Sequence, residues 1–448
     1  MRVLFVHYRV GERDGVSIEI EKRAKIFKEL GHEVFFLSGY DGISRKNSWV
    51  FPEVNILDPQ QQERRLNFFE RFVWTLEEAE KEFQDEYTSL TEKIRGVFAI
   101  VQPDLVCVHN VYSHAYQLPF TFALMTVQDE FAAKTLTVHH DFWFDRPRFT
   151  NSTYSFIREK VEQIPFDRPY IFKQQVINSI AQKALLDKRG ISAERIGDFF
   201  DFSKEHRTRE ADCNQLRTEL NINTKDFVIL HATRIIERKA IEIAIEYASQ
   251  LQSKFSQLTE PVVLNGKIVT KDTKVKILFS NFVEVDADVY VIKLKELALN
   301  KGVELIWGAA RFTLYEEEGK FSFWDSYALA SLVTYTSVAE GFGNQFLEAM
   351  YFKKPLVMLE YPVFVDDIKQ EGYHYISLGS KFKEEENKLF SIPSENMQTA
   401  VQFTFGFLEN SSELIKNLEL NFNTAKKYHD ASILAEELFH LCRQLAAD

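Results

Sequence analysis

The chain has 448 residues, of which 45% are hydrophobic and 27% charged, and its formal net charge at pH 7 is −12. This length exceeds what a single hydrophobic core usually organises, so it predicts two domains of about 200 residues each. The acidic balance argues against a nucleic-acid-binding protein, which needs a basic face. An anionic substrate would therefore need Arg or Lys residues concentrated at its site.

The cysteines are few and far apart, and they match no disulfide or zinc spacing: Cys107, Cys213 and Cys442. This usage indicates a reducing compartment. The first seven residues form a short charged and apolar stretch rather than a signal peptide, and no run approaches about 18 apolar residues. We therefore expect a cytoplasmic protein without an integral membrane segment, and we leave open whether it forms homo-oligomers.

The chain begins with the pattern of a parallel strand–helix–strand unit. The predicted elements are a strand at 3–7, a Gly-containing loop at 8–16, a helix at 18–30 capped by Ser17, and a strand at 33–38. Gly15 thus lies at the carboxyl end of the first strand, where α/β folds bind ligands. The loop lacks the GxGxxG fingerprint, which disfavours a nicotinamide cofactor.

Two later strands of the first half end in polar residues. After one or two amphipathic helices in 58–100, strands at 103–110 and 135–141 end at His109 and His140. A histidine in a strand is usually a structural residue. Here two histidines are expected at one edge of a sheet, beside the Gly15 loop. A ligand-binding site is therefore as good an interpretation as a structural role.

An aromatic run with two arginines follows the second histidine. Arg146 and Arg148 could clamp a carboxylate or phosphate, or they could belong to a surface loop paired with Asp145. A helix is predicted at 171–186, and the charged stretch 201–213 is predicted to be a linker.

The second half opens with a strand at 227–233 that leads into a basic loop. Arg234 and Lys239 are the concentrated cations that an acidic protein needs to hold a diphosphate, although they could also be exposed loop cations. A helix at 240–251 follows. The remaining predicted elements are strands at 275–280, 303–307, 332–336 and 356–359, a hairpin or loop at 258–273, a short helix at 324–331, and helices at 394–408 and 411–445.

A strand, a tight loop and a helix follow one another near residue 340. The amide groups of Phe342, Gly343 and Asn344 open the helix, and a helix N-terminus attracts phosphate. Glu340 in the loop and Glu348 in the helix present carboxylates, which accept hydrogen bonds from sugar and ribose hydroxyls. The stretch is typical of a nucleotide-sugar site, and the alternative is an ordinary strand–loop–helix with a solvated Glu.

Taken together, these motifs resemble the retaining nucleotide-sugar glycosyltransferases of family 4, the glycosyl transferases group 1. The two Glu eight residues apart, Arg234 separated from Lys239 by four residues, the Gly15 loop and the His140-Asp141 dipeptide all match the family pattern. The resemblance spans nearly the whole chain.

The resemblance implies an α/β protein with the GT-B fold, in which two Rossmann-like, doubly wound parallel-sheet domains face each other across a cleft. We expect residues 1–210 to form the acceptor-side domain and residues 211–425 the nucleotide-sugar domain. We expect residues 426–448 to form a helix that packs back on the first domain.

The resemblance also implies roles for these residues. Glu340 would contact hydroxyls of the donor sugar and Glu348 the ribose, while Arg234 and Lys239 would hold the diphosphate together with the amides of the helix start. His140 would lie beside the donor sugar and Gly15 near the phosphates and the acceptor. The family needs no obligatory metal or cofactor, and the leaving phosphate takes the acceptor's proton with retention at the anomeric carbon.

Two local features modify this comparison. Ala240 stands where the family usually has Gly, and we expect a harmless helical backbone there. The run 139–148 is similar to a branch that includes mannosylglucosylglycerate synthases, which transfer mannose from GDP-mannose to a small anionic acceptor. In that case Arg146, Arg148 and His109 would bind the acceptor.

The sequence therefore predicts a retaining enzyme that transfers a hexose from a nucleoside-diphosphate sugar, GDP-mannose or a UDP-hexose, to a small acceptor. One alternative is transfer from a UDP-sugar to a protein, polysaccharide or lipid-linked acceptor. A degenerate, non-catalytic binding subunit is another, against which the intact Glu340, Lys239 and Arg234 argue. A pyridoxal-type phosphorylase finds no support, because no dedicated Schiff-base lysine is evident.

Overall fold

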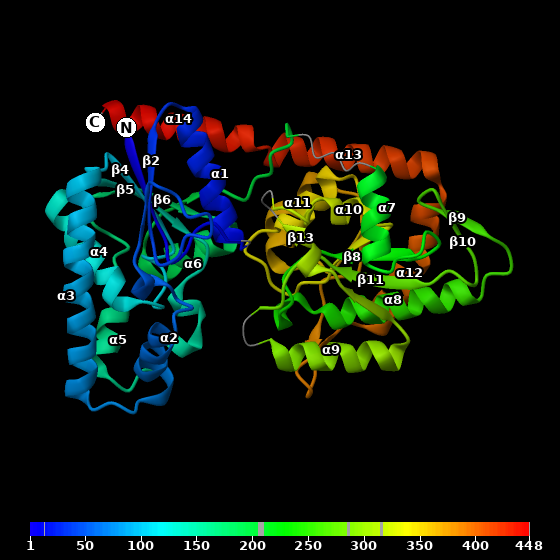
Figure 1. The fold of residues 1–448 in the computed structure, drawn as a ribbon, viewed down its shortest axis with the longest axis horizontal. Helices are drawn as coiled ribbons and strands as arrows, with labels where there is room; N and C mark the ends of the chain where they lie inside the picture. The colour runs from blue at the N-terminus through cyan, green and yellow to red at the C-terminus, as the bar shows by residue number, and fades with distance from the viewer. Residues whose placement is uncertain (13, 205–209, 285–286, 314–316, 448) are drawn as a thin grey trace. The chain divides into compact units, whose positions relative to one another are not determined.

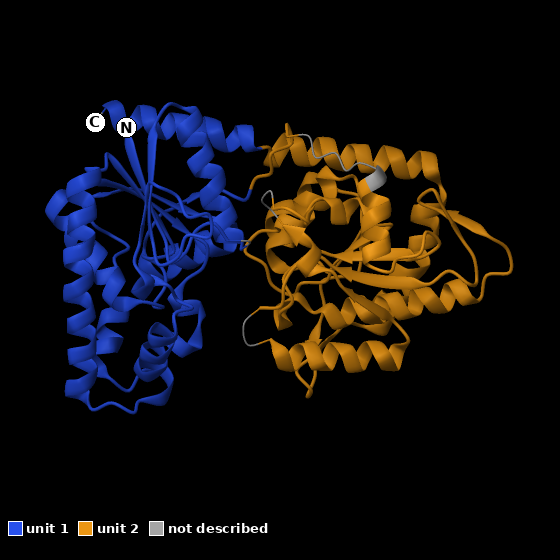
Figure 2. Ribbon diagram, in the orientation of Figure 1, with its two compact units in different colours: residues 1–198, 431–448 blue, residues 199–430 orange. Residues whose placement is uncertain are grey.

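The computed structural model describes residues 1–12, 14–204, 210–284, 287–313 and 317–447. The chain forms two compact units, which are coloured separately in Figure 2. Unit 1 contains residues 1–198 and 431–448, and unit 2 contains residues 199–430. The unit boundaries thus lie 12 residues before the predicted 210/211 boundary and five after the predicted 425/426 boundary.

Unit 1 is built on a seven-stranded, wholly parallel sheet in the order β3-β2-β1-β4-β5-β6-β7. Its strands are β1 Arg2–Val6, β2 Glu33–Ser38, β3 Ser48–Val50, β4 Leu105–His109, β5 Lys134–His139, β6 Ile171–Val176 and β7 Glu194–Arg195. The central strand β4 is buried along its whole length. A parallel sheet of this kind presents the carboxyl ends of all its strands at one edge, where ligands bind in α/β folds.

Helices connect these strands, and the chain's last helix belongs to the same unit (Figure 1). They are α1 Gly15–Glu29, α2 Pro59–Leu66, α3 Leu76–Val101, α4 Leu118–Phe131, α5 Ser155–Glu162, α6 Ser179–Arg189 and α14 Ala431–Ala447. Short turns are η1 Pro52–Val54, η2 Asn67–Arg71, η3 Trp143–Asp145 and η4 Pro147–Phe149. Helix α14 packs against α1.

The start of α1 differs from the prediction. Asp14, not Ser17, is the N-cap: its carboxylate accepts hydrogen bonds from the amides of Val16 at 3.0 Å and Ser17 at 3.1 Å. An aspartate caps a helix at least as well as a serine, so the helix begins three residues earlier than expected. Gly15 is therefore the first helical residue rather than part of the loop.

The helix predicted at 171–186 was wrong in its first half. Residues Ile171–Val176 form strand β6, which pairs with β5 and β7, and the helix α6 starts only at Ser179. Asn178 caps it by accepting from the amide of Ala181 at 2.7 Å. Pairing with both neighbouring strands outweighs the helix propensity of the Lys and Gln residues in this segment.

Unit 2 has a six-stranded parallel sheet in the order β12-β11-β8-β15-β16-β17. Its strands are β8 Phe227–His231, β11 Val275–Phe279, β12 Glu304–Trp307, β15 Leu332–Tyr335, β16 Leu356–Met358 and β17 Ile376–Ser377. Short ribbons lie outside it: β9 Val262–Leu264 with β10 Lys267–Val269, β13 Phe312–Thr313 with β14 Phe321–Ser322, and β18 Lys383–Glu384 with β19 Phe390–Ser391. The antiparallel pair β9–β10 is the hairpin alternative predicted for 258–273.

Among the described residues of unit 2, one helix precedes these strands, and the others lie in the segments between and after them. They are α7 Glu210–Glu219, α8 Ile241–Ser256, α9 Asp288–Lys301, α10 Asp325–Leu329, α11 Asn344–Tyr351, α12 Ser394–Glu409 and α13 Ser411–His429, with turns η5 Glu237–Lys239, η6 Ala309–Arg311, η7 Phe364–Ile368 and η8 Lys369–Glu371. The linker predicted at 201–213 was too long, because α7 already begins at Glu210; residues 205–209 lie outside the described part of the chain.

Alternate residues of β8 show how the unit 2 core is divided. Phe227 and Ile229 belong to one buried apolar cluster, and Val228 and Leu230 to another. Since successive side chains of a strand point to opposite faces, both faces of this sheet are covered by helices. This is the doubly wound arrangement that the sequence predicted.

The helix predicted at 411–445 is two helices. Asp430 separates α13 from α14, and the amide of Phe200 donates to the carbonyl of His429 at 2.8 Å. This backbone contact uses a carbonyl at the end of α13, where the chain passes from unit 2 back to unit 1. No helix among the described residues is both long and apolar enough to span a membrane.

Candidate functional site

Two loops of unit 2 meet at the carboxyl ends of the adjacent strands β8 and β15. The amide of Val338 donates to the carbonyl of Arg238 at 3.0 Å, and the Thr336 hydroxyl donates to the carbonyl of Lys239 at 2.9 Å. The basic loop and the loop before α11 are therefore joined through their backbones, although about one hundred residues separate them in sequence.

The side chains of these loops form a compact charge cluster around Glu340. One carboxylate oxygen is ion-paired with the Lys239 ammonium, and the other lies 2.9 Å from a guanidinium nitrogen of Arg238. Arg238 also donates to the carbonyl of Ala339 at 2.8 Å. The side chains of Glu340 and Lys239 are each 8% exposed. We call Glu340, Lys239 and Arg238 the carboxylate clamp.

Opposing effects set the protonation states of the clamp. Burial raises the pKa of Glu340, but the charges of Lys239 and Arg238 outweigh it and hold that pKa well below its usual range. Burial lowers the pKa of Lys239 to about 8, against the attraction of Glu340. At neutral pH Glu340 is therefore ionised and Lys239 is mostly protonated.

Sequence reasoning did not single out Arg238. The available signal was its position directly before Lys239 in the same basic loop, but nothing in a loop sequence shows that two adjacent cations reach the same carboxylate. Arg234, which was predicted to act with Lys239, is instead ion-paired with Glu284 and is not part of the clamp.

The backbone beside the clamp differs from the prediction. Ala240 is in the left-handed region, with φ 44° and ψ 50°, and is fully buried. This conformation crowds a Cβ against the following carbonyl and costs a non-glycine residue roughly 1–2 kcal/mol. The expectation of a harmless helical backbone was therefore wrong, and the glycine usual at this position in the family has a physical reason.

The start of α11 depends on a glycine. Gly343 has φ 153° and ψ 57°, and a Cβ there would collide with the hydroxyl of Tyr361, which donates to the carbonyl of Phe342 at 2.6 Å. No side chain caps the helix. The amides of Phe346 and Leu347 donate to the carbonyl of Gly343, so the first two amides of the helix, those of Asn344 and Gln345, are the ones that can bind a ligand at the same strand edge as the clamp.

Glu348 lies within α11 and is 9% exposed. It accepts a hydrogen bond from the hydroxyl of Tyr327 in α10. Burial and this carboxylate hold the pKa of Tyr327 well above its usual value, so the phenol remains a donor. The tyrosine fixes one oxygen of a carboxylate that the sequence predicts to bind ribose.

In unit 1, His140 and His109 lie together at the ends of β5 and β4. The amide of His140 donates to the side-chain oxygen of Asn110 at 2.8 Å, and His109 Nδ1 lies 3.3 Å from His140 Nε2. Burial lowers the pKa of His140 to about 3 and that of His109 well below its usual value, so both rings are neutral at pH 7. His109 is 0% exposed and lies behind His140, where it supports His140 rather than facing solvent.

The two predicted arginines converge on Tyr116. Guanidinium nitrogens of Arg146 and Arg148 lie 2.8 Å and 2.6 Å from its hydroxyl oxygen, and both groups also stack near its ring. Arg146 pairs with Asp141 at 2.9 Å. Asp145, the alternative partner considered from the sequence, pairs with Lys188 instead. We call Tyr116, Arg146 and Arg148 the arginine pair site.

A third arginine and a second ion pair border this site. The guanidinium of Arg65 in α2 lies 5.9 Å from the centre of the Tyr116 ring. His114 is ion-paired with Asp141. Burial raises the pKa of Asp141, but His114 and Arg146 outweigh it and hold that pKa well below the usual range. Sequence reasoning missed Arg65 and Tyr116, which are far from the arginines along the chain.

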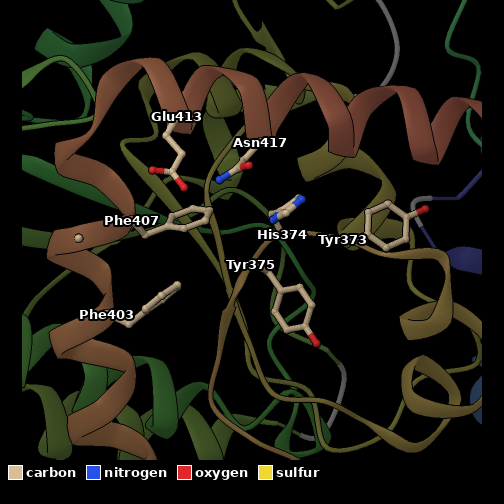
Figure 3. Close-up of a pocket in the computed structure, with 8 residues that line it drawn as sticks. Tyr373, His374, Tyr375, Phe403, Phe407, Glu413 and Asn417 are labelled. Carbon is tan, nitrogen blue, oxygen red and sulfur yellow. The ribbon is translucent and has the colours of Figure 1, made fainter.

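A cavity of about 300 Å³ lies elsewhere in unit 2 and contains none of the predicted site residues. Figure 3 shows its lining residues, with Phe403 and Phe407 on one helix and Glu413 and Asn417 on the next; the lining consists of Tyr373, His374, Tyr375, Phe403, Gly406, Phe407, Glu413 and Asn417. Residues 373–375 precede β17, so this cavity is at the amino edge of the sheet, opposite the clamp. Among the described residues, no cluster of His, Cys, Asp and Glu has the arrangement of a metal site.

Comparisons with known proteins agree with these features. Residues 212–377 match the family described as Glycosyl transferases group 1. The mannosylglucosylglycerate synthase of Petrotoga mobilis is 35% identical over 387 residues, covering 85% of this chain and 87% of the relative. The protein of the same name from Thermotoga maritima is 33% identical over 443 residues, covering 98% of this chain and 99% of the relative.

Solved structures show the fold. HepE of Anabaena in complex with UDP-glucose has a TM-score of 0.61 at 15% identity, covering 99% of this chain and all of that chain. Sucrose-phosphate synthase of Thermosynechococcus elongatus has a TM-score of 0.62 at 12% identity, covering 100% of this chain and 99% of that chain. The two parallel-sheet units are those of a GT-B glycosyltransferase.

Proposed function

Because the chain belongs to the glycosyl transferases group 1 family, we propose that it is a retaining transferase that moves mannose from GDP-mannose to a hydroxyl of glucosylglycerate. The carboxylate clamp at the start of α11 is the observation that carries the transferase assignment. The names of the two relatives and the arginine pair site support this donor sugar and this anionic acceptor.

Within this proposal, the clamp binds the diphosphate and the sugar of the donor. The Lys239 ammonium and the uncapped start of α11 supply positive charge for the diphosphate. The Glu340 carboxylate accepts hydrogen bonds from donor-sugar hydroxyls, and Glu348 accepts from the ribose. Arg234 exchanges its Glu284 partner for a phosphate oxygen. His140 lies beside the donor sugar, and Gly15 lies near the phosphates and the acceptor.

The ion pairs of the clamp suit alternation between empty and donor-bound states. In the empty protein Glu340 compensates two buried or half-buried cations. When a diphosphate takes over Lys239, Arg238 still compensates Glu340, so the carboxylate remains ionised and available to sugar hydroxyls. We therefore assign Arg238 the role of holding Glu340 in place, a role that sequence reasoning did not include.

The proposed chemistry needs no enzymic base. The acceptor hydroxyl attacks the anomeric carbon from the face that the diphosphate leaves. The bond from that carbon to the phosphate oxygen breaks, a bond to the acceptor oxygen forms, and the acceptor's proton passes to the departing phosphate. Lys239 and the helix start stabilise the charge on the leaving group, the largest single effect in many enzymes. The positive charge that a metal would provide thus comes from the chain itself.

The arginine pair site is proposed to bind the acceptor carboxylate. Two guanidinium groups, held in place by one phenol and by Asp141, form a rigid fork of donors that matches a carboxylate. Carboxylate binding would cost these side chains little entropy, because Tyr116 and Asp141 already hold the guanidinium groups in place. His109, fully buried behind His140, supports that ring rather than touching the acceptor.

The direct test is product formation from defined substrates. We expect the purified protein to convert GDP-mannose and glucosylglycerate to a product heavier by one hexose unit, and NMR to show the donor's α configuration in the new bond. Glucosylglycerol, which lacks the carboxylate, is the matched acceptor control and should react at least about 100-fold less efficiently, the scale of losing a charged partner.

Two results would contradict the proposal. An inverted β linkage would rule out retention. Equal turnover of glucosylglycerate and glucosylglycerol would rule out carboxylate recognition. The same assay with UDP-glucose in place of GDP-mannose tests the alternative donor. Product formed from UDP-glucose but not from GDP-mannose would favour a UDP-sugar.

A further inference from the structure

We propose that His7 is an acceptor-binding residue whose Nε2 atom accepts a hydrogen bond from the hydroxyl that receives the sugar. This inference rests on the proposed function and adds a residue that the sequence motifs do not contain. His7 directly follows β1, at the carboxyl edge of the unit 1 sheet, and the same edge carries His140 and the start of α1.

The tautomer of His7 follows from a single contact. Its Nδ1 lies 2.8 Å from the backbone carbonyl of His109. A carbonyl can only accept, so Nδ1 carries the hydrogen, and in the neutral ring the lone pair is on Nε2. Burial lowers the pKa of His7 to about 4, against the raising effects of Asp14 and the His109 carbonyl, so the ring is neutral at physiological pH.

The Nε2 atom has no hydrogen-bond partner among the residues that the structure describes. Two other histidine nitrogens of this unit, His109 Nε2 and His139 Nδ1, also have no partner, but they are fully buried, whereas His7 Nε2 is not among the fully buried atoms. His7 itself is 5% exposed. A buried ring thus presents an unused acceptor atom to the outside at the edge where this kind of sheet binds ligands.

Aromatic contacts connect His7 to the arginine pair site. The His7 ring lies 5.3 Å from that of Tyr8, and the Tyr8 ring lies 6.2 Å from that of Tyr116. His114, the ion-pair partner of Asp141, lies close enough to influence the charge of His7. His7 and the two arginines therefore belong to one continuous group of side chains in unit 1.

His7 and the two arginines, at opposite ends of this group of side chains, favour different functional groups of a ligand. A neutral nitrogen lone pair attracts a hydroxyl donor and repels a carboxylate, whereas guanidinium groups attract a carboxylate. An acceptor that carries both groups would be held at two points. The contact with His7 would then select which hydroxyl is presented to the anomeric carbon.

The test compares two substitutions of His7. In His7→Asn the side-chain amide keeps a donor for the His109 carbonyl but has no acceptor where Nε2 stood. We expect the kcat/KM for the acceptor to fall about 10- to 100-fold, the scale of losing one buried hydrogen bond, with the KM for the donor and the rate of donor hydrolysis unchanged. His7→Gln places an amide oxygen near the Nε2 position and should recover part of the loss.

His139→Gln is the matched control, because His139 is a buried histidine of the same sheet whose Nε2 pairs with Gln174 at 3.2 Å. It should retain the acceptor kcat/KM. A second measurement does not depend on turnover: ¹⁵N NMR of the imidazoles should show His7 as the Nδ1–H tautomer at pH 7, and its Nε2 signal should shift when glucosylglycerate is added.

The outcomes separate this inference from the proposed function. A wild-type protein that forms no product contradicts the proposed function. If the wild type is active, an unchanged acceptor kcat/KM in folded His7→Asn, or an Nε2–H tautomer of His7, contradicts only the role of His7.

Discussion

At the scale of single residues, the site depends on side chains whose charges are mutually compensated. Glu340 is nearly buried, yet it remains ionised because two cations contact its two oxygens. Removing one partner of such a cluster leaves the others buried and uncompensated, which costs more than the pair itself contributes. The clamp is therefore more sensitive to neutralising substitutions than to substitutions that preserve charge.

Lys239 gives a pH prediction. Its pKa of about 8 lies below the usual value because the ammonium is buried, so the free protein loses this cation as the pH rises through 8. We expect the kcat/KM for the donor to fall above pH 8. In Lys239→Arg, where the guanidinium stays charged, the fall should move to higher pH.

The measurement is a set of initial-rate profiles from pH 6 to pH 10, with unfolding temperatures recorded at each pH. Lys188→Arg, an exposed lysine paired with Asp145, is the control and should leave the profile unchanged. A profile of Lys239→Arg that superimposes on the wild type would show that another group causes the fall.

At the scale of elements, two short backbone segments place the clamp. One is the turn η5, which Ala240 directly follows, and the other is the loop that ends at Gly343. Ala240 and Gly343 both have a positive φ, a backbone conformation that disfavours a Cβ. Position 343 has a glycine, whereas position 240 has an alanine, whose Cβ is strained there. Strain of this kind persists only where surrounding contacts hold the backbone in place.

Ala240 gives a stability prediction. Ala240→Gly would remove left-handed strain of about 1–2 kcal/mol and lose a buried methyl group worth about 0.8 kcal/mol. We expect the free energy of unfolding to stay equal or to rise by about 1 kcal/mol. Ala244→Gly, in the right-handed interior of α8, should instead lose about 2 kcal/mol from helix propensity and methyl burial.

Denaturant unfolding of the two variants beside the wild type measures this difference. If both substitutions destabilise equally, the backbone at Ala240 is not under strain in solution.

At the scale of the whole molecule, the chain leaves unit 1 after Asp198 and returns to it at Ala431. Helix α14 then contributes Leu434, Leu438 and Leu441 to the buried interior, in contact with α1. The two ends of the sequence thus stabilise the same unit. Because α1 also carries the Gly15 end, the last helix supports the element that borders the proposed acceptor residues.

A core substitution in α14 tests this arrangement. Leu438 is 0% exposed, so Leu438→Ala should cost about 2–5 kcal/mol through lost burial and a cavity. Hydrogen exchange followed by mass spectrometry should show faster exchange in α1 and the other elements of unit 1. Leu418→Ala in α13 is the control, because Leu418 packs in a unit 2 cluster and should accelerate exchange there. Faster exchange in unit 2 alone after Leu438→Ala would contradict the assignment of α14.

Local patterns in the sequence were sufficient for strands β1, β2, β4, β5, β8, β11, β12, β15 and β16, for the strand–loop–helix around Glu340 and for the type of each charged motif. Hydrophobic periodicity reports burial directly, and glycines and acids at fixed spacing report turns and ligand chemistry. The segment 171–176 and the break at Asp430 were missed because their conformations depend on distant partners, strands β5 and β7 in one case and Phe200 in the other.

Only the tertiary structure showed how the motifs are combined. The pairing of Arg238 with Glu340, of Arg146 and Arg148 with Tyr116, and of His7 with the His109 carbonyl each joins residues that lie 30 or more positions apart. A sequence can show that a cation, a phenol or an imidazole is present. Which atom it contacts, and therefore its charge and free lone pair, is decided when parallel strands bring their carboxyl ends to one edge.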